Sequence, residues 1–159
     1  MTYFDDVAVG VRRELGAFRF TSEAIRAFAV QYDPQPFHVD ETLAARSHFG
    51  GLVASGWHVA AIWMRLNVKA REEDRLAAER AGRTAPVIGP SPGFRNMVWR
   101  KPVRPGDELF FFSEATGKKT QVSRPDWGVV LMRNGALDKA GEEVFAFDGA
   151  VFWKRRPIP

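Results

Sequence analysis

The sequence contains no cysteine. This absence excludes disulfide bonds, a thiolate nucleophile and a zinc site built from cysteine ligands. The first ten residues, MTYFDDVAVG, hold two aspartates and no basic residue, so they do not resemble a secretory signal peptide. No apolar run reaches the roughly 18 residues that a membrane-spanning helix needs. We therefore expect a cytoplasmic protein without a membrane segment.

Several common functional motifs are also missing. There is no G-x-G-x-x-G or Walker A pattern for nucleotide phosphates, no G-x-S-x-G elbow for a serine nucleophile and no EF-hand loop. The three histidines, His38, His48 and His58, do not form the helical i, i+4 pair of a zinc protease. The sequence therefore predicts neither a metal site nor a cofactor.

The composition is that of a globular protein with an aromatic core. Hydrophobic residues make up 45% and charged residues 26% of the 159 residues, a length that predicts one domain. Thirteen phenylalanines and five tryptophans indicate an aromatic core. Lysine and arginine number 23 against 19 acidic residues, a net charge of +4. This surplus suits an anionic small-molecule ligand that carries phosphate, but it is not a nucleic-acid-binding signature.

The first part of the chain predicts a strand and then a helix. Residues 11–20 have the composition of a strand. Thr21 or Ser22 can cap the helix that follows. One face of this helix is apolar at positions i, i+3, i+4 and i+7, which are Ile25, Phe28, Ala29 and Tyr32.

The prolines at positions 34 and 36 end that helix. Because proline disfavours helical geometry in the residue before it, the helix should stop at Tyr32 or Asp33. The residues that follow should lie in a turn pinned by the two prolines rather than on a helix. Asp40 can then cap a short helical segment over residues 41–46.

Residues 52–66, LVASGWHVAAIWMRL, predict a buried central helix. Only Ser55 and His58 are strongly polar in its central part. A helix that is apolar on nearly all sides packs inside the protein, and this one is too short to span a membrane. Residues 67–83 are charged and helix-prone. The Pro/Gly-rich residues 84–93 form a loop, which is either an insertion or a lid.

The C-terminal half predicts a meander of antiparallel strands. Four strands are expected, over residues 94–103, 108–123, 126–138 and 142–156, with glycine-containing turns at 104–107 and 138–141. One long buried helix followed by such strands indicates an α+β fold in which the sheet curls around the helix. A sheet of this kind leaves an edge open, and dimerisation can close it.

Asp33 and His38 are the first candidates for chemistry. They lie five residues apart, and Pro34 and Pro36 between them have fixed φ angles that can hold the carboxylate and the imidazole in one space. Such a pair can transfer protons. In the alternative interpretation Asp33 caps a turn and His38 is a packed residue. The residue types alone slightly favour this alternative.

Gly56, near the start of the central helix, is the second candidate. The first helical turn has free N–H groups and the positive end of the helix dipole, and glycine lets a ligand approach the backbone. This arrangement suits the oxyanion of a thioester carbonyl. Glycine at this position can equally serve close packing of the helix on the sheet. We expect His58 to be a hydrogen-bonded core residue and His48 to be exposed.

A cluster of basic residues surrounds one expected strand and the turn after it. These residues can hold the phosphates of a nucleotide-like ligand, or they can form a solvated strand face, which is the commoner case. They are Arg95, Arg100, Lys101 and Arg104.

Together these features resemble the MaoC-like dehydratases, also called hydratase 2 or (R)-specific enoyl-CoA hydratases. The family motif, Asp-x-Asn-Pro-aliphatic-His, stands here as DPQPFH over residues 33–38. Residues 39–57 are similar to the family segment that ends in a glycine at the start of the central helix. Residues 100–109 are similar to the family's Pro-Val-x-x-Gly-Asp turn. The resemblance covers residues 9–156 of a single domain over 1–159, with 67–92 as an insertion.

The resemblance implies a hot-dog fold, in which an antiparallel sheet wraps around one long helix. It implies a homodimer or higher homo-oligomer with active sites near the interface, and an acyl-CoA thioester as substrate. By position, Asp33 and His38 would activate water for addition across a trans-2-enoyl thioester, or for the reverse dehydration. The backbone N–H of Gly56 would hold the thioester oxygen. The substrate-binding residues would be Gln35, Phe37, Ser55, Trp57, Arg100, Lys101 and Arg104.

Two departures from the family pattern bear on the substrate. Gln35 replaces the asparagine of the motif, and Met64 stands near the position where some members have a serine that supports the aspartate. The group that supports Asp33 must therefore differ. A narrow acyl pocket, and with it a short or unusual acyl group, is predicted from three aromatic side chains, those of Phe37, Trp57 and Trp63.

We therefore expect an enoyl-CoA hydratase or acyl dehydratase, a hydro-lyase that works without a cofactor. Two alternatives stay open. One is a hot-dog acyl-CoA thioesterase that uses Asp33 as base or nucleophile, and the other is an acyl-CoA-binding or partner subunit without turnover. The pairing of Asp33 with His38 favours the lyase, because a thioesterase needs no imidazole at that spacing.

Overall fold

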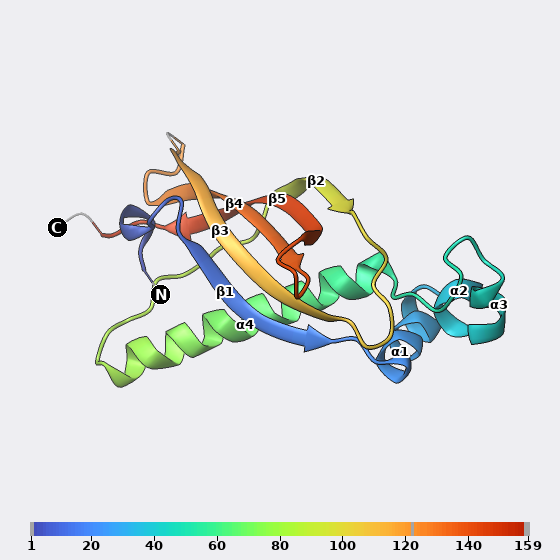
Figure 1. The fold of residues 1–159 in the computed structure, drawn as a ribbon. Helices are drawn as coiled ribbons and strands as arrows, with labels where there is room; N and C mark the ends of the chain where they lie inside the picture. The colour runs from blue at the N-terminus through green and yellow to red at the C-terminus, as the bar shows by residue number, and fades with distance from the viewer. Residues whose placement is uncertain (1, 122, 158–159) are drawn as a thin grey trace.

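The computed structural model describes residues 2–121 and 123–157, which form one curved sheet and a set of helices (Figure 1). A short 3-10 helix, Phe4–Asp6, precedes the first strand. In chain order the other elements are β1 (Arg12–Arg19), α1 (Ser22–Tyr32), α2 (Pro36–Val39), α3 (Glu41–Ala45), α4 (Gly56–Arg80), β2 (Gly93–Trp99), β3 (Glu108–Thr120), β4 (Trp127–Leu137) and β5 (Glu143–Lys154).

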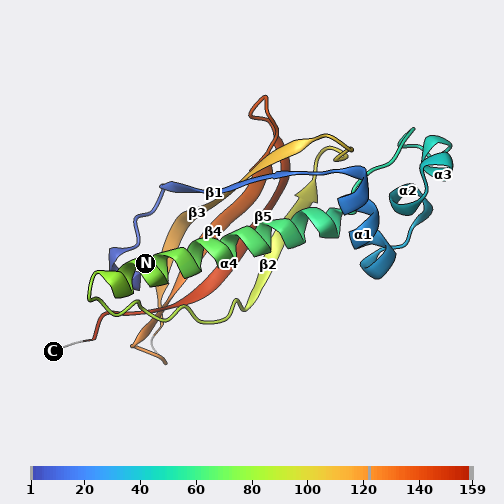
Figure 2. The same cartoon turned by 90° about the horizontal axis from the view of Figure 1, so that it is seen from below.

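The sheet has five strands in the order β1-β3-β4-β5-β2, and all neighbours are antiparallel. Figures 1 and 2 show α4 lying along one face of the curved sheet, while α1, α2 and α3 gather at the N-terminal end of α4. This is a hot-dog fold, so the predicted α+β class and architecture are confirmed. No helix in the described part of the chain has the length and apolar character that a bilayer crossing needs.

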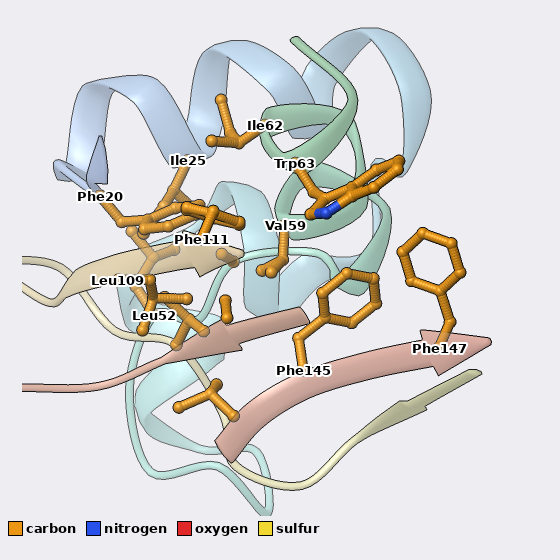
Figure 3. Packing of buried hydrophobic residues seen from close by; sticks show 14 of the residues in the cluster. Phe20, Ile25, Leu52, Val59, Ile62, Trp63, Leu109, Phe111, Phe145 and Phe147 are labelled. Atoms are coloured by element: carbon orange, nitrogen blue, oxygen red, sulfur yellow. The ribbon is translucent and has the colours of Figure 1, made fainter. Parts of the chain in front are cut away.

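The core lies between α4 and the sheet. Its largest fully buried side chains include Phe20, Phe111 and Phe145. Figure 3 shows these rings gathered around Val59 and Trp63 of α4. Burial of each such side chain favours folding by roughly 1.5–3 kcal/mol. The aromatic core expected from the composition is therefore what holds the helix on the sheet.

The central helix is longer than predicted and starts later. α4 runs over 25 residues, because the charged segment after residue 66 continues it to Arg80. It begins at Gly56 rather than at residue 52, since Ser55 caps it by accepting a hydrogen bond from the N–H of Trp57. Residues 52–55 are irregular and buried. Gly56 is thus the first residue of the helix, close to its predicted place.

One face of α4 is covered by the sheet, and the opposite face is exposed in the single chain. The exposed face carries Trp57, Met64 and Val68, which are 55%, 52% and 56% exposed. Their spacing of seven and four residues aligns them along the helix, and we call them the α4 stripe. We expected a helix that is packed on nearly all sides. In the single chain only the face toward the sheet is packed.

Residues 36–39, which precede Asp40, do not form the predicted turn. Pro36 is the first residue of α2, a position where proline has no N–H to satisfy. His38 therefore lies on a short helix, and the prediction of a non-helical turn is wrong here. The two caps are as expected: Thr21 accepts from the N–H of Ala24, and Asp40 accepts from that of Leu43.

The loop after α4 runs back along the last strand. The N–H of Gly89 donates to the oxygen of Phe152, and that of Lys154 donates to the oxygen of Val87. Figure 2 shows this segment leaving the C-terminal end of α4, away from α1, α2 and α3. Its position therefore does not suit a lid over the start of α4. The proposal that residues 67–92 are an insertion stays a prediction.

Candidate active site

Asp33 and His38 come from two helices that meet beside the start of α4. Asp33 is the C-cap of α1, and its N–H donates to the oxygen of Ala29 at 2.9 Å. Pro34 turns the chain away from α1, and α2 then presents His38. The distance between Asp33 Oδ2 and His38 Nε2 is 3.4 Å. The structure thus brings the two sequence candidates together.

Two side chains donate hydrogen bonds to the Asp33 carboxylate. Ser55 Oγ donates to Oδ2 at 2.6 Å, and Gln35 Nε2 donates to Oδ1 at 2.8 Å. Burial raises the pKa of Asp33, but the hydrogen bonds from Ser55 and Gln35 and the nearby His38 lower it, so the net pKa lies below the usual value. Asp33 is therefore an oriented carboxylate near neutral pH.

His38 is held through its other ring nitrogen. Its Nδ1 lies 2.7 Å from the backbone oxygen of Val53, which can only accept, so Nδ1 carries the hydrogen. The side chain is 7% exposed. Phe37 packs edge-on against the imidazole, with ring centroids 4.5 Å apart. These contacts fix the ring and leave Nε2 facing Asp33.

Ser55 connects the carboxylate to the start of α4. It is fully buried, and its hydroxyl both donates to Asp33 and accepts from the N–H of Trp57 at 3.2 Å. Met64, by contrast, is exposed on the α4 stripe. Ser55 is therefore the supporting group that the sequence required in place of Met64. It does not line the pocket, so its predicted contact with the substrate stays a prediction.

Gly56 has an unpaired N–H and a close neighbour. In the described part of the chain no acceptor is paired with its N–H. A Cβ on Gly56 would lie only 2.7 Å from Cε2 of Trp99, so the missing side chain makes room for that ring. Trp99 Nε1 also donates to the oxygen of Gly56 at 2.9 Å. Both interpretations of this glycine, an open N–H and close packing, fit the geometry.

A pocket of about 390 Å³ opens beside these residues. Asp33, Gln35, His38 and Gly56 contribute its polar groups. Most of the remaining wall is apolar and consists of Phe37, Phe49, Val53, Ala54, Trp57, Val59, Trp99, Pro102 and Val103. An apolar pocket with a few convergent polar groups is typical of a small-molecule site.

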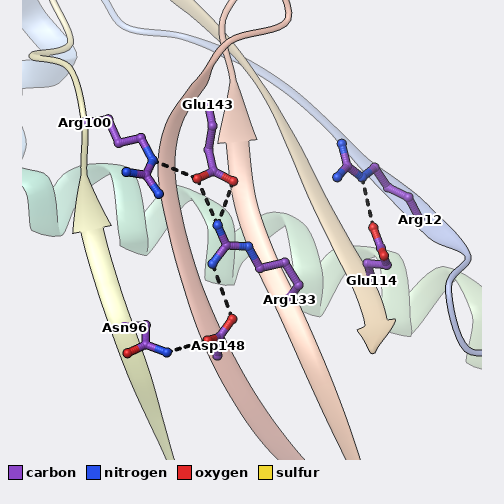
Figure 4. Close-up of polar contacts among 7 residues, drawn as sticks. All are labelled: Arg12, Asn96, Arg100, Glu114, Arg133, Glu143 and Asp148. Carbon is purple, nitrogen blue, oxygen red and sulfur yellow. Dashed lines mark hydrogen bonds and ion pairs between the residues drawn. The ribbon is translucent and has the colours of Figure 1, made fainter. Parts of the chain in front are cut away.

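Arg100 lies at the rim of this pocket but is already paired. Its Nε donates to Glu143 at 2.9 Å. Figure 4 shows that Glu143 also accepts from Arg133, which in turn reaches Asp148. The predicted phosphate partner is therefore part of an ion-pair network on the sheet, and a ligand phosphate would have to join or replace Glu143.

Two of the other three predicted phosphate ligands are also engaged, and the third, Arg95, does not line this pocket. Lys101 lines the pocket and forms ion pairs with Asp138 and Glu142. Arg104 donates from Nη2 to the oxygen of Phe49 at 2.6 Å and lies outside the pocket wall. Arg104 therefore positions the loop that carries Phe49, and its direct contact with a ligand stays a prediction.

Trp99 and Val53 were missed by sequence reasoning. Trp99 lies on β2, 43 residues from its partner Gly56, and no local pattern links the two. Val53 contributes its backbone oxygen, a group that every residue has, so the residue type gives no signal for this role. Both assignments depend on long-range packing, so only the folded chain reveals them.

The remaining histidines lie outside the pocket. His58 is 5% exposed and is a core residue, as predicted, but the expected hydrogen bond is missing at its buried Nδ1, which has no partner among the described residues. The ring instead stacks on Phe28, with centroids 4.6 Å apart. Burial, together with Arg65, lowers the pKa of His58 to about 4. His48 is exposed, as expected. No group of three or more potential metal ligands occurs within the described ranges.

The fold and the pocket define a hot-dog protein with a carboxylate–imidazole pair at the start of its long helix. The chain belongs to the family of the MaoC-like domain, whose model matches residues 9–133. The family resemblance drawn from the sequence is thereby confirmed. The similar solved structures include proteins described as a MaoC-like dehydratase and as an R-hydratase.

Individual relatives agree with this assignment. The MaoC-like dehydratase from Rhodospirillum rubrum is 38% identical, with a TM-score of 0.81 over 99% of this chain and 100% of that one. The unliganded R-hydratase PhaJ1 from Pseudomonas aeruginosa shares the fold at 19% identity, with a TM-score of 0.67 over 99% and 93% of the two chains. YdeM from Bacillus subtilis (strain 168), described as an uncharacterized protein, is 28% identical over 95% of this chain and 98% of its own length.

Proposed function

We propose that this protein is an enoyl-CoA hydratase or acyl dehydratase, which adds water to a trans-2-enoyl-CoA or removes it from the 3-hydroxyacyl product. The observation that carries the proposal is the 3.4 Å separation of Asp33 Oδ2 and His38 Nε2 in a pocket that also contains the unpaired N–H of Gly56. A base, an acid and a donor for negative charge are the three groups that this reaction requires.

In hydration, a water molecule held between Asp33 and His38 attacks the β-carbon. The water oxygen bonds to that carbon, and one water proton passes to the Asp33–His38 pair. The pair returns one proton to the α-carbon, so the protein ends in the protonation state in which it began. General acid–base catalysis by positioned groups contributes about 10²–10⁴ in rate.

The thioester oxygen gains negative charge while the α-carbon awaits its proton. The N–H of Gly56 is an available donor for this charge, because it lies at the first residue of the 25-residue helix α4. The helix dipole adds to its effect. Preorganised donors of this kind are worth about 10²–10³ in kcat. The roles of Gln35, Phe37, Trp57, Arg100 and Lys101 in holding the substrate belong to the same proposal.

We also propose a homodimer, formed through the α4 stripe and the open edge of β2. On β2, Phe94 is 56% and Trp99 41% exposed. Trp99 meets Trp57 of the α4 stripe with ring centroids 5.7 Å apart, so edge and stripe form one apolar surface beside the pocket. An exposed apolar patch next to an unpaired strand edge favours association. A second copy would then lie close to the candidate site.

Purified protein mixed with crotonyl-CoA tests the proposed reaction. Loss of the enoyl-thioester absorbance without release of free thiol supports hydration. Release of CoA thiol would indicate the thioesterase instead. Binding of acyl-CoA with neither change would indicate a partner subunit without turnover.

A further inference from the structure

A continuous row of aromatic rings runs from the pocket into the space between α4 and the sheet. Trp57 meets Trp99 at a centroid distance of 5.7 Å, and Trp99 stacks on Phe145 at 5.8 Å. Phe145 lies 5.6 Å from Phe147, which meets Trp63 edge to face at 4.7 Å. Figure 3 shows Phe145, Phe147 and Trp63 together between the helix and the strands.

The pocket ends where this row becomes buried. Trp57 and Trp99 belong to the pocket wall. Phe145, Phe147 and Trp63 lie behind that wall and are 0%, 8% and 6% exposed. Trp63 is also fixed by its Nε1, which donates to the oxygen of Phe112 at 3.0 Å. The space further along α4 is therefore already filled with protein.

Trp99 is held on two sides. Its Nε1 donates to the oxygen of Gly56 at 2.9 Å, and its ring lies so close to Gly56 that a Cβ there would be 2.7 Å away. On the other side it stacks on buried Phe145. The ring cannot swing aside without losing both the hydrogen bond and the stacking. Trp99 is thus a fixed end wall next to the proposed position of the thioester.

Three other apolar residues of the pocket wall are also held in the interior. Val53, Val59 and Val103 are 1%, 1% and 4% exposed and belong to the packed interior. The whole pocket measures about 390 Å³ and must also admit the pantetheine arm. This volume lies near the lower limit of about 300 Å³ for small-molecule sites.

From these contacts we infer that the substrate is a short-chain enoyl thioester of crotonyl size, and that Trp99 sets the limit on acyl length. The inference rests on the proposed function and specifies its substrate class. It differs from the expectation drawn from the sequence, because the limiting ring is Trp99 on β2. Trp63 and Phe147 act behind it.

A series of enoyl-CoAs tests the chain-length limit. The expected result is a kcat/KM for crotonyl-CoA at least about tenfold above that for trans-2-octenoyl-CoA and trans-2-dodecenoyl-CoA, since poor accommodation of an apolar group costs a factor of this order. Equal or better use of octenoyl-CoA would overturn the inference while leaving the hydratase proposal intact.

Trp99→Leu tests the assigned residue. It should raise the ratio of octenoyl-CoA to crotonyl-CoA turnover by about tenfold. Trp99→Phe, which keeps the stacking but loses the hydrogen bond to Gly56, should shift the ratio less and in the same direction. The matched control is Phe110→Leu, because Phe110 is 44% exposed in the sheet and lies outside the pocket. An unchanged ratio in Trp99→Leu overturns the assignment.

Binding separates this inference from the proposed reaction. Calorimetric titration of wild-type protein and Asp33→Asn with butyryl-CoA and octanoyl-CoA requires no turnover. Tighter binding of butyryl-CoA supports the short pocket even if every enoyl-CoA fails to react, an outcome that would reject the hydratase proposal alone. Octanoyl-CoA that binds as tightly as butyryl-CoA rejects the short pocket.

Discussion

The hydroxyl of Ser55 donates to Oδ2 of Asp33 at 2.6 Å while it accepts from the N–H of Trp57. One buried side chain therefore fixes both the proposed catalytic carboxylate and the helix end that carries Gly56. The proposed acid–base group and the proposed donor for the thioester oxygen are thus positioned together, and a change at Ser55 should affect both.

Replacement of the pair itself gives the most direct test. Asp33→Asn and His38→Gln should each lower kcat/KM for crotonyl-CoA by at least about a hundredfold, the lower bound for loss of a general acid or base. The circular dichroism spectrum should stay that of the wild type. His48→Gln is the control, because His48 is exposed and lies outside the pocket. Near wild-type turnover in both pair variants would show that the site is wrongly assigned.

Ser55→Ala should impair the reaction through Asp33. A hydrogen bond to a charged group is worth about 1.5–3 kcal/mol, which corresponds to a loss in kcat of about 10–100-fold. The pKa of Asp33, which this bond lowers, should rise. The acid limb of the kcat/KM profile should therefore move to higher pH.

Thr21→Ala is the matched control for Ser55→Ala. It also removes a helix cap, at the start of the helix that ends in Asp33, and should cost about 1 kcal/mol of stability. It should leave the acid limb in place, because Thr21 does not contact Asp33. An equal shift in both variants would mean that loss of stability, rather than the Ser55 hydrogen bond, moves the profile.

Gln35→Glu should place a second negative charge beside Asp33 Oδ1, where Gln35 Nε2 now donates at 2.8 Å. Like charges disfavour ionisation, so the pKa of Asp33 should rise and activity at low pH should fall. Gln35 is exposed, so Gln35→Ala should have a smaller effect than Ser55→Ala. The pH dependence of kcat/KM measures the Asp33 pKa in both Gln35 variants. A larger shift in Gln35→Ala than in Ser55→Ala would contradict the prediction that Ser55 contributes more to the low pKa of Asp33.

His58 should make the fold sensitive to acid. Its pKa in the folded protein is about 4, below the ordinary 6.5, because burial disfavours the charged ring. The unfolded chain therefore takes up this proton at higher pH than the folded protein does. The stabilisation is complete above pH 6.5 and is lost as the pH falls toward 4, by about 3 kcal/mol in all.

Urea unfolding at a series of pH values measures this loss. His58→Phe should keep the stacking on Phe28 and flatten the dependence of the unfolding free energy on pH between about 6.5 and 4. His48→Gln should leave it unchanged. A slope that persists in His58→Phe would assign the acid sensitivity to another group.

Met64→Glu should break the proposed dimer. Met64 is 52% exposed in the middle of the α4 stripe, and a carboxylate there would be buried without a partner at an apolar interface. Sedimentation equilibrium should show a dimer for the wild type and a monomer for the variant. Lys69→Glu, on the same helix with a side chain that is 71% exposed, should remain dimeric. If the wild-type protein sediments as a monomer, the homodimer proposal is wrong.

Much of the fold could be predicted from local patterns. Thr21 and Asp40 cap helices where short polar side chains precede apolar periodicity, and the strands follow their turn residues. The length of α4 was predicted only in part, because its charged second half lacks the apolar pattern of the first and is held by helix propensity and local ion pairs such as Arg75 with Glu72.

The sequence by itself determined the candidate pair: Asp33 and His38 lie close along the chain, and the rigid prolines between them limit how far apart they can move. Only the tertiary structure decided what surrounds the pair. Ser55 lies 22 residues from Asp33, and Trp99 lies 43 residues from Gly56. Contacts over such separations form when helix and sheet pack, and residue spacing does not encode which side chains then meet.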